Sequence, residues 1–150
     1  MTDISFTQNR ELSWLKFDQR VLEEANDKDV PILERLRFFS IFDTNLEEFF
    51  MVRVGSLSDF KNLKKKPVDS KSGMTSDEQI EAILSECIDL YRKKDQVYEQ
   101  IVDDLKVNGI NLLKVSELNE KDRKSVEYYF NTKIEPILNF QVVDLSLIHI

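Results

Sequence analysis

The chain has 150 residues, 41% of them hydrophobic, which is enough for one compact core without a disulfide or a structural metal. Acidic residues outnumber lysine and arginine by 28 to 21, and the net charge of −7 opposes nonspecific attraction to nucleic-acid backbones. Three glycines, three prolines and a 33% share of charged residues are typical of helical proteins rather than turn-rich β-sandwiches. We therefore expect an all-α fold and no nucleic-acid partner.

Apolar residues at helical spacing predict two helices near the start of the chain. The first runs from about Asn9, a preferred N-cap residue, to about Ala25, and two adjacent apolar tracks form its inner face. The second follows Asp29 and includes Pro31, because proline is accepted in the first turn of a helix. This second helix is nearly apolar all round, so we expect it to lie at the centre of the fold.

A capping box predicts a bend near residues 43–45 and a third helix after it. The box is formed either by Thr44 with Glu47 or by Asn45 with Glu48. Residues 61–73 then combine charge with proline, serine and glycine without periodicity, which predicts a mobile loop. A solvated loop explains its lysine cluster more simply than a polyanion site does; the cluster is Lys61, Lys64, Lys65, Lys66 and Lys71.

A second capping box, Thr75 with Glu78, predicts a long helix that Gly109 ends. Its apolar residues step by three and four and predict a heptad-like seam: Ile80, Leu84, Cys87, Tyr91, Tyr98, Ile101 and Leu105. Residues 110–115 are expected to be extended, and Asn119 is expected to cap a last helix that Pro136 terminates.

These elements predict two regions. Residues 1–108 form a helical bundle with a long helical hairpin, and residues 109–150 contain a connecting strand, a helix and the start of a following domain. The segment 137–150 is apolar and rich in residues that favour β-structure, so its side chains need a partner. We therefore expect the chain to be cut from a longer protein, with this short extended segment entering the next domain.

Few residues could carry catalytic chemistry. His149 is the sole histidine, which argues against Ser/His/Asp or Cys/His machinery and against a histidine-rich metal site. The three glycines are far apart, so no phosphate-cradling loop is predicted. Cys87 is the sole cysteine and lies on an apolar helical track, which favours a buried structural thiol in a reducing compartment. We expect no catalytic residue and no metal ligand in this chain.

Asn45 and Arg53 place an amide and a guanidinium among five phenylalanines. Asn45 either caps a helix, the simpler interpretation from composition, or offers its amide to a ligand. In an unbroken helix it would share one line with Phe38, Phe42 and Phe49. Arg53 has no acidic residue three or four positions away, so it needs a tertiary ion pair, which is the commoner arrangement, or an anion.

Four blocks of the sequence resemble, in order and spacing, the N-terminal region of bacterial polyphosphate kinases, and extend into the start of the head domain that follows it there. The blocks are Asn9–Phe17, Arg20–Ala25, Pro31–Phe38 and Asn45–Val54. The resemblance spans essentially the whole chain and is weakest in the lysine loop and after Asp144. There the family's His-Pro-Phe-Pro continuation is replaced by Leu-Ser-Leu-Ile-His-Ile, so we assign His149 no role.

The resemblance implies a place in a larger enzyme. In that family a helical N-terminal domain precedes a head domain and two catalytic domains, and the enzyme reversibly transfers the terminal phosphate of ATP to polyphosphate through a phosphohistidine. By similarity Asn45 contacts the nucleotide, whereas the phosphohistidine and the residues that bind Mg²⁺ lie in domains that this sequence does not contain. The chain alone is expected to be inactive.

The expected partners are the other domains of the same polypeptide, ATP and polyphosphate, in a cytoplasmic homo-oligomer whose peripheral membrane association is left open. The alternative hypothesis is a helical dimerisation or interaction module that contacts no ligand and uses the seam between residues 80 and 105 for assembly.

Overall fold

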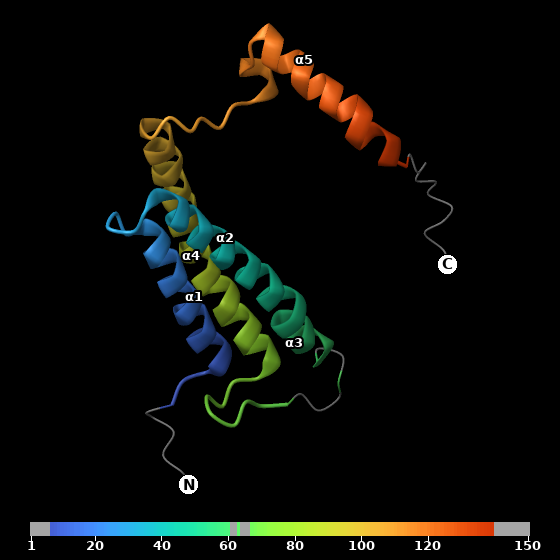
Figure 1. The fold of residues 1–150 in the computed structure, drawn as a ribbon. Coiled ribbons are helices and arrows are strands. Elements are labelled where there is room, and N and C mark those ends of the chain that lie inside the picture. Colours follow the sequence, from blue (N-terminus) through green and yellow to red (C-terminus); the bar gives the residue numbers. More distant parts are fainter. Residues whose placement is uncertain (1–6, 61–62, 64–66, 140–150) are drawn as a thin grey trace. The chain divides into compact units, whose positions relative to one another are not determined.

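A computed structural model of the chain describes residues 7–60, 63 and 67–139 (Figure 1). The chain divides into two units, Met1–Asn111 and Leu112–Ile150. Regular secondary structure in the described residues is helical, which confirms the all-α prediction; the β-pairing found among them is one isolated bridge between Val68 and Thr75. No helix in the described part of the chain is long and apolar enough to cross a bilayer.

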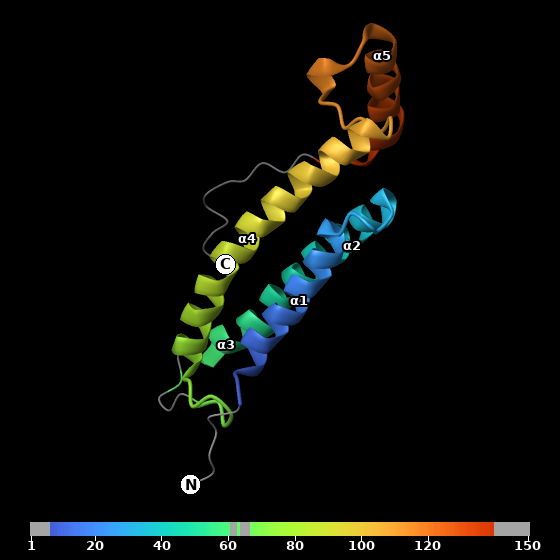
Figure 2. The same cartoon turned by 90° about the vertical axis from the view of Figure 1, so that its left-hand side faces the viewer.

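The first unit is a bundle of three long helices, α1 (Arg10–Asn26), α2 (Ile32–Phe49) and α4 (Ser76–Val107). Helices α1 and α2 form an antiparallel hairpin, and α4 packs against both (Figures 1 and 2). Apolar side chains from all three helices fill the space between them because each helix buries one stripe. The most deeply buried are Leu22, Ala25, Phe42, Leu46, Ile83, Ile101 and Leu105.

Helix α2 shows that the predicted bend at residues 43–45 is wrong. The helix continues through Asn45 to Phe49, so neither proposed capping box forms. Phe42, Leu46 and Phe49 are at most 3% exposed and recur at helical spacing, so an unbroken helix buries all three on one face. Burying three such side chains contributes several kcal/mol, more than the roughly 1 kcal/mol of an N-cap.

The start and the burial of α2 also differ from expectation. Pro31 occupies the N-cap position rather than the first turn. The helix is not buried all round, because Leu33 is 58% exposed and Ile41 is 40% exposed. It therefore forms one wall of the bundle rather than its centre.

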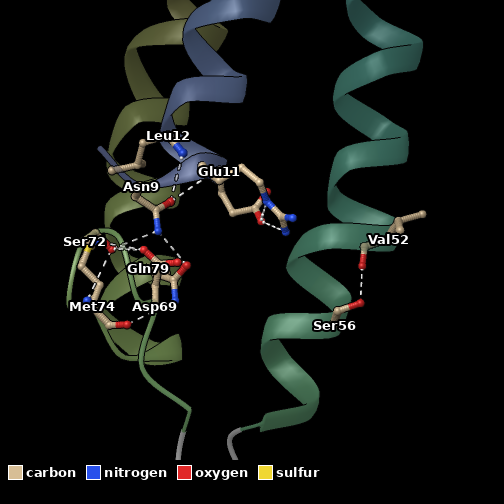
Figure 3. A network of polar contacts seen from close by, with 10 residues as sticks. Asn9, Glu11, Leu12, Val52, Ser56, Asp69, Ser72, Met74 and Gln79 are labelled. Carbon is tan, nitrogen blue, oxygen red and sulfur yellow. Dashed lines mark hydrogen bonds and ion pairs between the residues drawn. The ribbon is translucent and has the colours of Figure 1, made fainter. Parts of the chain in front are cut away.

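Beyond Phe49 the helix widens into a π-helical turn, η1 (Phe50–Val54), before the short helix α3 (Gly55–Asp59). A π-helical turn has i→i+5 bonding and contains one residue more than an α-helical turn. The Ser56 hydroxyl donates to the carbonyl oxygen of Val52 at 2.6 Å (Figure 3), in addition to the backbone N–H of Gly55 that this carbonyl accepts. Helix α3 then packs against α4.

Both predicted ends of α4 are confirmed. The Thr75 and Glu78 side chains form the capping box, and Gly109 adopts a left-handed φ of 79°. The Gly109 N–H donates to Lys106 and the Ile110 N–H to Leu105, at 3.0 and 2.9 Å, which is the Schellman pattern that needs a residue free to adopt positive φ.

The predicted seam of α4 is correct at four positions and wrong at three. Ile80, Cys87, Ile101 and Leu105 are buried, but Leu84, Tyr91 and Tyr98 are 43–49% exposed. The buried stripe instead uses Ile83, Leu90 and Val97, each one residue earlier in the chain. Apolar residues line both neighbouring tracks of this helix, and packing against α1 and α2 decides which of them is buried.

One carboxylate organises a hydrogen-bonded turn at residues 69–73, within the segment for which the sequence predicts a mobile loop. Asp69 accepts hydrogen bonds from the Ser72 N–H and hydroxyl at 2.7 and 2.6 Å, and Gly73 closes the turn with a φ of 72°. These hydrogen bonds hold the pKa of Asp69 below its usual range. Of the lysine cluster, Lys71 is described, and the other four members lie outside the described residues.

Asn9 joins this turn to the starts of α1 and α4 (Figure 3). Its Oδ1 accepts from the N–H groups of Glu11 and Leu12, which confirms the predicted cap. Its Nδ2 donates to Gln79 Oε1 at 2.8 Å and to Ser72 Oγ at 3.3 Å. One buried amide thus caps α1 and ties the first turns of two helices together.

The second unit contains α5 (Glu120–Tyr129), which the Asn119 side chain caps as predicted. Instead of the strand expected at residues 110–115, the chain is irregular there and then enters a 3₁₀ turn, Val115–Glu117. After α5 come a π-helical turn and a 3₁₀ turn that contains Pro136. None of the residues 112–139 is buried, and the predicted extended segment lies outside the described residues from 140 onward.

Candidate functional site

The structure brings both residues singled out from the sequence into one open hollow of about 270 Å³ on the first unit. Its wall is formed by α1 and by the stretch from α2 into η1. The lining residues are Trp14, Asn45, Glu48, Phe49, Val52 and Arg53. The spacing of the last five is helical, so one face of a continuous element supplies most of the wall.

The widened turn η1 helps to put Asn45 and Arg53 on the same face. Eight α-helical residues at about 100° each would leave the two side chains about 80° apart around the axis. Residues in a π-helical turn rotate less per residue, because more of them share each turn. The rotation between Asn45 and Arg53 therefore falls closer to two whole turns, and the two side chains come nearer to alignment.

Asn45 caps no helix, since it lies within α2 and is half-buried. Its Nδ2 donates to Oδ1 of Asp18 on α1 at 3.0 Å. The Asn45 side chain also lines the hollow, so it is accessible from outside the bundle. The interpretation of Asn45 as a cap is wrong, and the line of Phe42 and Phe49 expected for an unbroken helix is the arrangement present.

Asp18 is the residue that sequence reasoning overlooked. Its side chain is 0% exposed, and its second carboxylate oxygen, Oδ2, has no hydrogen-bond partner in the described structure. Burial raises the pKa of Asp18 from an ordinary 3.8 to about 6, and the hydrogen bond from Asn45 partly opposes this rise. The sequence held a signal for it: Asp18 lies three residues after Leu15 and four before Leu22, on the buried track of α1.

Stacked aromatic rings form the apolar part of the hollow. Trp14 and Phe49 have centroids 4.4 Å apart and planes within 4° of parallel, and Phe50 meets Phe49 edge-on with centroids 5.9 Å apart. Such packed rings contribute about 0.5–1.5 kcal/mol per pair beyond their buried area. They give the hollow a rigid wall of the kind on which a planar ring system can pack.

Arg53 is exposed and forms no ion pair within residues 7–60, 63 and 67–139. The tertiary ion pair expected for it is therefore not found among these residues. Glu48 lines the same hollow and is also exposed, so the opening carries one cation and one anion. In the part of the chain that the structure describes, no three histidine, cysteine, aspartate or glutamate side chains are grouped closely enough to hold a metal ion.

Among the other buried polar residues of the described structure, Ser76 Oγ and Arg35 Nη2 have no hydrogen-bond partner, but the remaining donors of Arg35 serve the fold. Arg35 is 3% exposed, and its guanidinium donates to the Ala25 carbonyl at 2.9 Å and to Asp104 at 2.7 Å. It joins the end of α1 to α2 and α4. Cys87 is buried in the core as predicted, and burial raises the pKa of its thiol to about 11, which makes it a poor nucleophile.

Comparison with known proteins gives a consistent result. Residues 7–113 match the family described as the polyphosphate kinase N-terminal domain. A polyphosphate kinase from Halalkalibacterium halodurans is 42% identical over 145 residues, which cover 96% of this chain and 21% of that protein. One from Bacillus cereus is 37% identical over the same shares of the two chains.

A solved structure agrees with the sequence matches. The crystal structure of polyphosphate kinase from Porphyromonas gingivalis superposes with a TM-score of 0.61 at 26% identity, over 89% of this chain and 20% of that one. The chain thus spans about a fifth of the length of these relatives.

Proposed function

We propose a role for this chain from its family, since it belongs to the polyphosphate kinase family. It forms the N-terminal part of an enzyme that reversibly transfers the terminal phosphate of ATP to polyphosphate. Its contribution is to hold the base of the nucleotide. The phosphohistidine and the residues that bind Mg²⁺ belong to other domains, so the chain alone is inactive. The full enzyme is a cytoplasmic homo-oligomer.

The observation that carries the proposal is the meeting of Asn45 with an aromatic wall in one accessible hollow. An amide can hydrogen-bond the polar edge of a purine while Trp14, which is stacked on the buried Phe49, offers apolar surface to the ring. A volume of about 270 Å³ lies at the lower limit for small-molecule sites, which suits a wall that covers the base while other domains cover the rest.

Arg53 supports the same assignment. Among the described residues its guanidinium has no carboxylate partner, and it opens into the hollow that Asn45 lines. A guanidinium placed in this way attracts phosphate oxygens by charge and by paired N–H donors. Positioning the nucleotide, rather than making or breaking bonds, is what these two residues contribute.

The test replaces Asn45 with alanine in the full-length enzyme that contains this chain. Loss of one hydrogen bond worth about 0.5–1.5 kcal/mol should raise the KM for ATP about three- to tenfold with little change in kcat. Asn26→Ala, at the exposed end of α1, is the matched control and should leave KM unchanged. An unchanged KM for Asn45→Ala, together with a large loss of thermal stability, would show that this amide serves only the fold.

A second candidate function is assembly, and one observation favours it. Helix α4 exposes a second apolar stripe beside its buried one, formed by Leu84, Ile88, Tyr91 and Tyr98, which are 43–57% exposed. Such a stripe suits packing against another helix. Light scattering of this chain across a range of concentrations tests the idea, since a monomer at every concentration would exclude a self-sufficient dimer seam.

A further inference from the structure

We propose that Asp18 is a positioning residue that fixes the orientation of the Asn45 amide, so that the hollow selects a base whose polar edge donates a hydrogen bond. The inference rests on the proposed function, because it takes the base to meet Asn45. It assigns to Asp18 a role in specificity that neither its sequence position nor the family match specifies.

The first step is the geometry of the pair. Asp18 is 0% exposed, and its Oδ1 lies 3.0 Å from Asn45 Nδ2. An ionised carboxylate has only acceptor oxygens, whereas an amide has a donor end and an acceptor end. Asn45 must therefore turn its NH₂ group toward Asp18, which occupies one of its two N–H donors and leaves Oδ1 as the acceptor on the opposite side of the amide.

The second step is the cost of the opposite orientation. Turning the amide by half a rotation would place Asn45 Oδ1 against a carboxylate oxygen, with two acceptors facing each other at a buried site. Asp18 would then lose the hydrogen bond that its Oδ1 accepts from Asn45. Because its Oδ2 has no partner in the described structure, neither carboxylate oxygen would then be hydrogen-bonded. A buried carboxylate stripped of this donor is costly, so the observed orientation is the strongly favoured one.

The third step is the chemistry of the ligand. The free Oδ1 of Asn45 can accept a hydrogen bond but cannot donate one. It matches the 6-amino group of adenine and is mismatched to the 6-oxo group of guanine or hypoxanthine. A site built to pair with a donor rejects analogues that lack it, because its own polar atom is left unpaired.

The experiment compares nucleotides in the full-length enzyme at about pH 8, where Asp18 is ionised, using ATP, ITP and purine riboside triphosphate, which lacks the 6-amino group. The wild type should prefer ATP over purine riboside triphosphate by about three- to tenfold in kcat/KM. In Asp18→Asn the partner side chain can donate as well as accept, so the Asn45 amide can turn. The preference for ATP over ITP should then fall by about the same factor.

Asp43→Asn is the matched control, because it makes the same chemical change on an exposed carboxylate of α2 that pairs with Lys94. It should keep the wild-type ratio of ATP to ITP. A purely structural role for Asp18 would lower the activity on all three nucleotides together, whereas a positioning role changes their ratio.

Two results would overturn the inference. One is a folded Asp18→Asn enzyme with an unchanged ratio of ATP to ITP. The other is a wild type that does not distinguish ATP from purine riboside triphosphate, a result that needs no variant and so holds even if Asp18→Asn fails to fold. If Asn45→Ala still raises the KM for ATP, the proposed function stands without this refinement; if it does not, both fall.

Discussion

Changing Asp18 to asparagine should stabilise the bundle by an amount that grows as the pH rises. Burial raises the pKa of Asp18 from 3.8 to about 6 in the folded state. Each unit of difference between the pKa of the folded state and that of the unfolded state corresponds to about 1.36 kcal/mol. The full cost of ionising Asp18 in the fold is therefore about 3 kcal/mol. An asparagine of the same shape carries no charge and bears no such cost.

The direction in which stability changes with pH depends on whether the folded or the unfolded state binds the proton more tightly. Below about pH 4 the carboxyl is largely protonated in both states, and its titration costs the fold almost nothing. Between about pH 4 and 6 the unfolded chain releases the proton while folded Asp18 keeps it, so wild-type stability falls relative to the variant. Above about pH 7 the penalty is complete. About 2 kcal/mol of the difference should develop between about pH 4 and 7.

Urea unfolding of both chains, followed by the fluorescence of Trp14, measures this difference. Trp14 is the sole tryptophan and lies on α1, one helical turn from Asp18, so its emission reports on the bundle rather than on the second unit. Asp103→Asn, an exposed residue of α4, is the control and should track the wild type at every pH. A difference between Asp18→Asn and wild type that stays flat or shrinks as pH rises would refute the reasoning.

Three further substitutions or measurements test other parts of the bundle. Arg35→Met should cost about 3 kcal/mol in urea unfolding, because it leaves the partly buried Asp104 unpaired. Ile101→Ala, at a fully buried site, should cost about 2–5 kcal/mol, whereas Val107→Ala, 85% exposed, should cost less than about 0.5 kcal/mol in the same assay. Cys87 should react with a thiol reagent roughly a hundredfold more slowly in the native chain than in urea, since its thiol is buried.

Local signals in the sequence were sufficient for the helix ends. Asn9, Thr75, Asn119 and Gly109 act within four residues of their own position, so their roles could be predicted without knowing the fold. The predicted break at residues 43–45 had equally good local chemistry and was wrong. There the burial of an apolar stripe shared with two other helices outweighed the cap, and this energy depends on partners distant in sequence.

The buried face of α4 shows the same limit. Ile83 and Leu84 are adjacent apolar residues, and a spacing of three and four residues fits a stripe through either one. Periodicity predicts that one face is buried, but the packing angle between helices decides which face it is.

The candidate site could be predicted only in part, for a similar reason. Asn45 and Arg53 stood out by composition, whereas the hydrogen bond from Asn45 to Asp18 joins residues 27 positions apart and exists only once α1 lies against α2.

The wide turn between Phe50 and Val54 makes the winding of the chain a determinant of the site. If the same residues were wound as a regular α-helix, Arg53 would lie about 80° from Asn45 around the helix axis. Helix α3 would then present a different side to α4, and the guanidinium of Arg53 would swing away from the amide of Asn45. Side chains in this stretch can be exchanged one for another only where the exchange preserves the wide turn, because both the proposed nucleotide wall and the packing below it depend on that turn.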